Sequence, residues 1–152
     1  MSWIDKIWND YLMTKKEDAW LIGLKEFGTK EIGGDIHNDE VLKYFHQSGF
    51  LNVDNDELSW CAAFVNWCIV KSGRKGTLSL AARSFMNWGT KVTTPKIGDV
   101  AVFWRESPES WKGHVGFLIR EDRDQVWVLG GNQSNQVNIM PYQKNRLLGY
   151  RR

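Results

Sequence analysis

The sequence lacks several features that would place it in a specialised class of protein. It has only two cysteines in 152 residues, too few for a disulfide scaffold. It contains no repeat, no low-complexity tract and no linker, which favours one domain over residues 1–152. No run of about 18 apolar residues exists, so no membrane span is expected. Met1–Asp10 carries acidic residues and no apolar run after a basic start, so no secretory signal is expected.

What is present is an ordinary globular composition with an uneven charge distribution. Residues 1–59 hold six lysines against twelve Asp and Glu, whereas residues 60–152 hold fourteen Lys and Arg against six Asp and Glu. The basic second part suits an anionic partner such as a cell-wall polymer, and a solvated surface is the alternative. No basic cluster with interleaved aromatic residues is found, so nucleic acid is not an expected partner.

Apolar periodicity predicts helices first and strands afterwards. The helices are expected over residues 3–12, 18–27, 38–47, 59–71 and 81–88. The strands are expected over residues 99–104, 114–120, 125–131, 136–140 and 147–151. This order predicts an α+β fold in which N-terminal helices pack on an antiparallel sheet of about five strands. The helix 59–71 is apolar on almost every side, which predicts burial around most of its circumference.

The two cysteines differ in their expected chemistry. Seven residues on one helix put Cys61 and Cys68 about 10.5 Å apart, too far for a disulfide or a shared metal ion. With Ser59 as the N-cap, Cys61 lies in the first turn, where the helix dipole lowers the pKa of a thiol. Cys68 lies two turns further in, where packing is the expected role. For Cys61, a nucleophile and a packed side chain are both open.

A thiolate nucleophile needs a base, and His114 at the start of an apolar strand is the candidate. His37 and His46 are expected to be surface or capping residues. A hairpin turn centred on Arg123 would place His114 opposite Asn132, Gly116 opposite Gly130 and Leu118 opposite Val128. The Asn132 side-chain oxygen could then accept a hydrogen bond from one ring nitrogen and leave the other to face the thiol. Cys, His and an amide in this chain order match papain-like cysteine enzymes.

Several segments together resemble a known family: DELSWCAAFVNWCIVKSG, AARSFMNWG, PKIGDVAVFW, GHVGFLI and VLGGNQSNQVNI followed by LLGYR. Over about residues 18–151 the chain is similar to the NlpC/P60 superfamily, closest to the CHAP-like amidases of phage and bacterial cell-wall hydrolases. The resemblance implies a papain-like fold, with Cys61 as nucleophile, His114 as base and Asn132 as the third residue. Many CHAP domains carry a glutamate two residues before that asparagine. Here the position holds Gly130, so Gln133 is the fallback for the third role.

The resemblance also implies hydrolysis of an amide bond in the stem peptide or cross-bridge of peptidoglycan by acyl transfer. The backbone N–H of Cys61 is the expected oxyanion donor. The expected substrate-binding residues are Trp60, Trp88, Trp111 and Gln133, with core packing as the alternative for the tryptophans. No cofactor is expected, and the acidic run at residues 54–57 is either a solvated turn or a calcium site.

The expected partner is peptidoglycan, and an immunity protein is a further candidate. The protein is expected to be a monomer. Such an enzyme would be made in the cytoplasm and reach the wall by phage-type release or by injection as an antibacterial effector. Two alternatives have the same fold. One is a cysteine hydrolase or acyltransferase that acts on a substrate outside the wall, and the other is a wall-binding module without activity.

Overall fold

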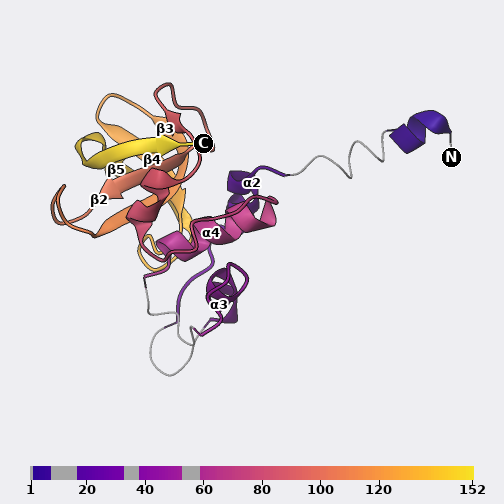
Figure 1. Cartoon of the computed structure of the whole chain (residues 1–152), viewed down its shortest axis with the longest axis horizontal. Coiled ribbons are helices and arrows are strands. Elements are labelled where there is room, and N and C mark those ends of the chain that lie inside the picture. Colours follow the sequence, from indigo (N-terminus) through magenta and orange to yellow (C-terminus); the bar gives the residue numbers. More distant parts are fainter. Residues whose placement is uncertain (1, 8–16, 33–37, 53–58) are drawn as a thin grey trace.

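The computed structural model of the chain describes residues 2–7, 17–32, 38–52 and 59–152 (Figure 1). Residues 3–7 are helical, and the longer helices are α2 (Ala19–Leu24), α3 (Asp39–His46), α4 (Cys61–Lys71) and the 3-10 helix η1 (Ala82–Asn87). The strands are β1 (Lys91–Val92), β2 (Val100–Trp104), β3 (Gly113–Glu121), β4 (Gln125–Gly130), β5 (Asn138–Gln143) and β6 (Leu147–Arg151). A short 3-10 turn, η2 (Lys144–Arg146), joins β5 to β6. None of the helices in these described segments has the length and apolarity needed to cross a bilayer.

The strands form one antiparallel sheet in the order β1-β6-β2-β3-β4-β5. Helices α2 and α4 lie against the sheet, and α3 packs on α4 (Figure 1). The predicted α+β class is therefore confirmed. The strand missing from the prediction is β1, because two residues are too few to show an alternating pattern.

The sheet is strongly curled, so that strands far apart in the ladder meet. The Phe103 ring on β2 lies 5.1 Å from the Tyr142 ring on β5, although β3 and β4 separate these strands in the ladder. The Trp104 indole N–H donates to the carbonyl of Asn145 in η2, just before the β6 strand that pairs with β2, at 3.3 Å. The curled face encloses a small core that includes Leu118 and Val128. The opposite face packs on the helices and forms the larger core.

Helix α4 is the central element of that larger core. All nine residues from Cys61 to Ile69 are buried, as the all-round apolar pattern predicted. The helix start differs from the prediction, because Trp60 occupies the N-cap position and no side chain caps the helix there. The predicted cap, Ser59, lies one residue outside. Cys61 is therefore the first residue of the helix.

The other helices follow the sequence with smaller differences. Asn38 caps α3, and its side-chain oxygen accepts from the Glu40 N–H at 2.8 Å, as expected. The predicted helix over 18–27 ends at Leu24 and continues as turns to Gly28, which has a φ of 92°. The predicted helix over 81–88 is the 3-10 helix η1. The second half of the predicted helix over 3–12 lies outside the described residues.

Candidate active site

The thiol of Cys61 lies at the start of α4 and faces the beginning of β3. It is within hydrogen-bonding reach of the His114 side chain, of the backbone N–H of Val115 and of the Ser59 hydroxyl. Only 3% of Cys61 and 6% of His114 is exposed. The two residues expected as nucleophile and base, 53 positions apart in the sequence, are thus brought together by the packing of α4 on β3.

The N–H of Val115 is available to the sulfur because strand β4 ends early. The Leu118 N–H donates to Asp99, on the side where β2 lies. Since N–H groups point to alternate sides along a strand, the Val115 N–H points towards β4. The pairing of β3 with β4 begins only at Phe117 and Leu129. The N–H of Val115 therefore has no strand partner and is left to act on the Cys61 thiol, whose pKa it lowers.

These contacts set the charge state of Cys61. Burial acts to raise the pKa of the thiol, but the hydrogen bond and the positive charge from His114 act in the opposite direction. The Val115 N–H and the Ser59 hydroxyl add to them, and the net result is a lowered pKa. The thiol of Cys61 therefore differs from that of a merely packed cysteine, whose pKa burial alone would raise.

The predicted hairpin register holds in the middle of β3 and fails at both ends. Leu118 pairs with Val128 as expected, but nearer the turn a bulge shifts the ladder by one residue, so that Arg120 pairs with Trp127. The predicted pairing of His114 with Asn132 is wrong, because β4 ends at Gly130 and the chain bends away at residues 131–135. Asn132 has a left-handed φ of 56°, as do Ser134 and Asn135 at 53° and 61°. A ladder extrapolated beyond the end of a strand cannot anticipate such a reversal.

The reversal brings Gln133, not Asn132, to the histidine. The Gln133 Oε1 lies 2.9 Å from His114 Nε2, and Gln133 is 2% exposed. Over the described residues, no hydrogen bond joins Asn132 to His114. The expected fallback residue therefore makes the contact expected of Asn132. Its burial beside the ring does not match its other expected role, binding substrate.

The hydrogen bonds of Gln133 determine which nitrogen of His114 carries the proton. The Gln133 side-chain nitrogen donates towards the Val128 carbonyl at 3.1 Å and the Asn138 carbonyl at 2.9 Å. Carbonyl oxygens only accept, so the amide nitrogen must face them and Oε1 must face His114. An amide oxygen also only accepts, so the Nε2 of His114 donates. In the neutral ring, Nδ1 is then the basic nitrogen, left for Cys61.

Two glycines make room for this arrangement. A Cβ at Gly130 would lie 2.4 Å from Gln133 Oε1 and 3.3 Å from His114 Nε2. A Cβ at Gly131 would lie 2.7 Å from both Phe64 and Trp60 of the helix start. The prediction that glycines admit the helix start here is therefore right in kind, but the close approach is at Gly131. At Gly116 the free space is filled by Val128 instead.

An aromatic ring covers the histidine. Tyr142 from β5 stacks on His114 with 4.7 Å between ring centroids and 17° between planes. The same ring stacks on Phe103, which is directly opposite His114 in the ladder of β2 and β3. Sequence patterns did not indicate Tyr142, since only the curl of the sheet brings β5 to this position.

The three tryptophans expected near the substrate have different environments. Trp60 is fully buried, and its indole N–H donates to Glu31 at 3.0 Å, so it belongs to the core. Trp88 donates to the carbonyl of Lys75 and lies under the Arg74 guanidinium, 4.3 Å from it, beyond the C-terminal end of α4. Trp111 is 75% exposed in the loop before β3. Of the three, Trp111 alone combines an exposed ring with a position near His114 in the chain.

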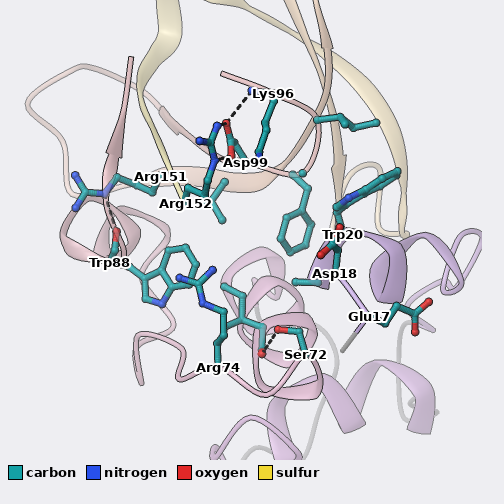
Figure 2. Close-up of a pocket in the computed structure, with 16 residues that line it drawn as sticks. Glu17, Asp18, Trp20, Ser72, Arg74, Trp88, Lys96, Asp99, Arg151 and Arg152 are labelled. Carbon is teal, nitrogen blue, oxygen red and sulfur yellow. Dashed lines mark hydrogen bonds and ion pairs between the residues drawn. The ribbon is translucent and has the colours of Figure 1, made fainter. Parts of the chain in front are cut away.

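A cavity of about 390 Å³ opens at the far end of α4 from Cys61 (Figure 2). Arg74 and Trp88 form one wall, and the ion pair of Arg152 with Asp99 forms another. Since α4 has eleven residues, this cavity lies about 16 Å along the helix axis from Cys61. Trp88 lines this cavity, which the Cys61 site does not share.

The second cysteine is a packing residue. Cys68 is fully buried, and burial raises the pKa of its thiol well above the ordinary value, with the charge of Glu26 acting in the same direction. Its sulfur would lie 3.1 Å from a Cβ added at Gly23 of α2, which shows how closely the two helices pack. No cluster of three or more metal-ligand side chains occurs within the segments that the structure describes. The acidic run at residues 54–57 and His37 lie outside those segments.

Comparison with known protein families identifies the chain. A family model described as the CHAP domain matches residues 53–132, which is more than half of the chain. The matched range contains Cys61, His114 and Asn132 and stops one residue before Gln133. No curated protein matches the chain.

Proposed function

The chain belongs to the CHAP domain family, and on this basis we propose that it is a cysteine-dependent hydrolase that cleaves an amide bond in peptidoglycan. The observation that supports the proposal most directly is the series of contacts from Cys61 to His114 to Gln133. A wall-binding module without activity would not need a thiol with a lowered pKa. The net positive charge of residues 60–152 suits an anionic polymer as substrate.

The proposed reaction is acyl transfer in two steps. The Cys61 thiolate attacks the carbonyl carbon of the amide, and the carbonyl oxygen becomes an oxyanion. The backbone N–H of Cys61, at the helix N-terminus, is directed to stabilise that charge. The His114 imidazolium donates the proton on Nδ1 to the leaving amine, the C–N bond breaks, and a thioester to Cys61 remains.

The second step releases the acid. A water molecule attacks the thioester while Nδ1 of neutral His114 takes one of its protons. The C–S bond then breaks, and the thiolate and imidazolium of the resting enzyme are restored. Gln133 accepts a hydrogen bond from Nε2 throughout, so that the same ring nitrogen faces Cys61 in both steps. Ser59 and the Val115 N–H stabilise the thiolate between turnovers.

The test is digestion of purified sacculi by the protein and by matched variants. The wild-type protein and Cys68→Ala are expected to release soluble fragments, whereas Cys61→Ala and His114→Ala release none. Mass spectrometry of the fragments identifies the bond by its new termini. A wall substrate would be rejected if the unmodified wild-type protein left sacculi intact although its Cys61 reacted normally in a separate alkylation assay. That outcome would favour a cysteine hydrolase or acyltransferase with a substrate outside the wall.

A further inference from the structure

The ring of Tyr142 occupies a position that the acyl-transfer mechanism does not yet use. It lies nearly parallel to the imidazole of His114, at a planar angle of 17° and a centroid separation of 4.7 Å. Phe103 supports it from β2, at 5.1 Å and 29°. Three rings from three strands are thus stacked at the base of the site. This stacking depends on the tertiary structure, since these strands are not all neighbours in the sheet.

The contacts of His114 fix the plane of its ring and engage both ring nitrogens. Gln133 holds Nε2, Cys61 lies at Nδ1, and Tyr142 covers a face. A flip of the imidazole by half a turn would exchange the two ring edges and would have to displace the tyrosine. The hydrogen bond to Gln133 is a single contact at one ring nitrogen, so it does not by itself fix the plane of the imidazole.

The π face of Tyr142 also bears on the charge of the ring. The face of an aromatic ring carries negative electrostatic potential and attracts a cation placed over it. When Cys61 is a thiolate, His114 is its imidazolium partner, and Tyr142 lies against that cation. The phenol itself stays neutral, since burial and the charge of Cys61 raise the pKa of its hydroxyl.

We propose that Tyr142 is a positioning residue for His114. The ring of Tyr142 fixes the plane of the imidazole and stabilises the imidazolium that pairs with the Cys61 thiolate. The proposal rests on the proposed acyl transfer for its effect on turnover, but its effect on Cys61 can be measured without any wall substrate. The aromatic ring carries the effect, and the phenol hydroxyl is not required for it.

The other groups around His114 do not account for such an effect. Gln133 is neutral, and the Arg83 guanidinium in η1 is occupied by the carbonyls of Ser107, Pro108 and Lys112. Arg105, just after β2, acts on the phenol of Tyr142 through its charge. The contacts of the imidazole thus include two ionisable groups, Cys61 and Tyr142.

The experiment is the pH profile of Cys61 alkylation by iodoacetamide, in a background with Cys68→Ala. Tyr142→Leu removes the ring, and Tyr142→Phe keeps it. The midpoint of the profile is expected to rise by about half to one and a half pH units in Tyr142→Leu and to stay unchanged in Tyr142→Phe. Hydrolysis of sacculi at neutral pH is expected to fall about tenfold or less in Tyr142→Leu alone.

The matched control is Tyr150→Leu. Tyr150 belongs to the same small core inside the curled sheet and is 7% exposed, but its hydroxyl bonds to Glu121, away from the histidine. Its loss should lower thermal stability without a change in the alkylation midpoint. Should Tyr142→Leu fail to fold, Tyr142→Met serves in its place, because a flexible side chain fills irregular gaps.

Three results would overturn the proposal. One is an unchanged midpoint in folded Tyr142→Leu or Tyr142→Met. Another is an equal rise in Tyr142→Phe, which would assign the effect to the hydroxyl, and the third is an equal rise in Tyr150→Leu, which would assign it to a loosened core. A wild-type protein that shows the expected profiles but leaves sacculi intact would instead reject the peptidoglycan substrate and leave the role of Tyr142 standing.

Discussion

Adding one methyl group at Gly130 should disable the site while leaving the fold in place. The Cβ of Gly130→Ala would lie 2.4 Å from Gln133 Oε1 and 2.9 Å from its Cδ. Ordinary contacts begin near 3.4 Å, so the amide must move by about 1 Å. A shift of that size stretches the 2.9 Å contact with His114 Nε2 beyond hydrogen-bonding distance.

The size of the effect follows from the bond that is lost. A hydrogen bond to a group that becomes charged contributes about 1.5 to 3 kcal/mol, and each 1.4 kcal/mol changes a rate tenfold. We therefore expect kcat/KM for Gly130→Ala to fall by about tenfold to a hundredfold. Stability should change less, because alanine is favoured over glycine in a strand by about 0.5 to 1 kcal/mol, which offsets part of the lost bonding.

The assay is kcat/KM on sacculi together with the melting temperature, and Gly149→Ala is the control. Gly149 is also a strand glycine, and its added Cβ would meet only the flexible end of Met86, at 3.2 Å. The control should keep its full activity. Wild-type activity in a folded Gly130→Ala variant would show that His114 does not depend on Gln133 and would refute the reasoning.

Further predictions concern the thiols, the amide and the exposed indole. Iodoacetamide should modify Cys61 well below the pH at which a free thiol ionises, because its pKa is lowered, and should not modify folded Cys68, whose pKa is raised; mass spectrometry of the peptides distinguishes the two. Gln133→Glu should lower activity as much as Gln133→Ala, although glutamate has the shape of glutamine, because a carboxylate oxygen would face the carbonyls of Val128 and Asn138. Full activity of Gln133→Glu would contradict the assigned orientation of the amide. Trp111→Ala should raise KM for sacculi and leave the melting temperature unchanged, since the ring is 75% exposed, and a large loss of stability would place it in the core instead.

The sequence is most informative where local chemistry decides the outcome. The apolar pattern of residues 59–71 predicts a buried helix whatever it packs against, and the structure buries all residues from Cys61 to Ile69. Position within that helix separates the two cysteines, because only the first turn offers free N–H groups. The pairing of Leu118 with Val128 was also predicted, although a bulge between Leu118 and Arg120 shifts the register nearer the turn.

Local pattern is insufficient at the ends of elements. Ser59 is of a residue type that often caps helices. Its hydroxyl instead interacts with the Cys61 thiol, and the helix starts without a side-chain cap. The residue that contacts His114 is Gln133 in place of Asn132 because β4 ends at Gly130. Whether a ladder continues for two more residues depends on what packs beside it, here the start of α4 against Gly131.

By itself, therefore, the sequence determined the α+β class and the place of Cys61 in the first turn of a buried helix, since propensity and periodicity act over a few residues. The lowered pKa of that thiol depends on His114, which only the packing of α4 on β3 brings to it. Tertiary structure alone decided which amide orients His114, which backbone N–H faces the sulfur and which ring covers the imidazole. Those three depend on the early end of β4 and on the curl that carries β5 to β2. Both arise from packing between segments far apart in the chain, which no short stretch of sequence encodes.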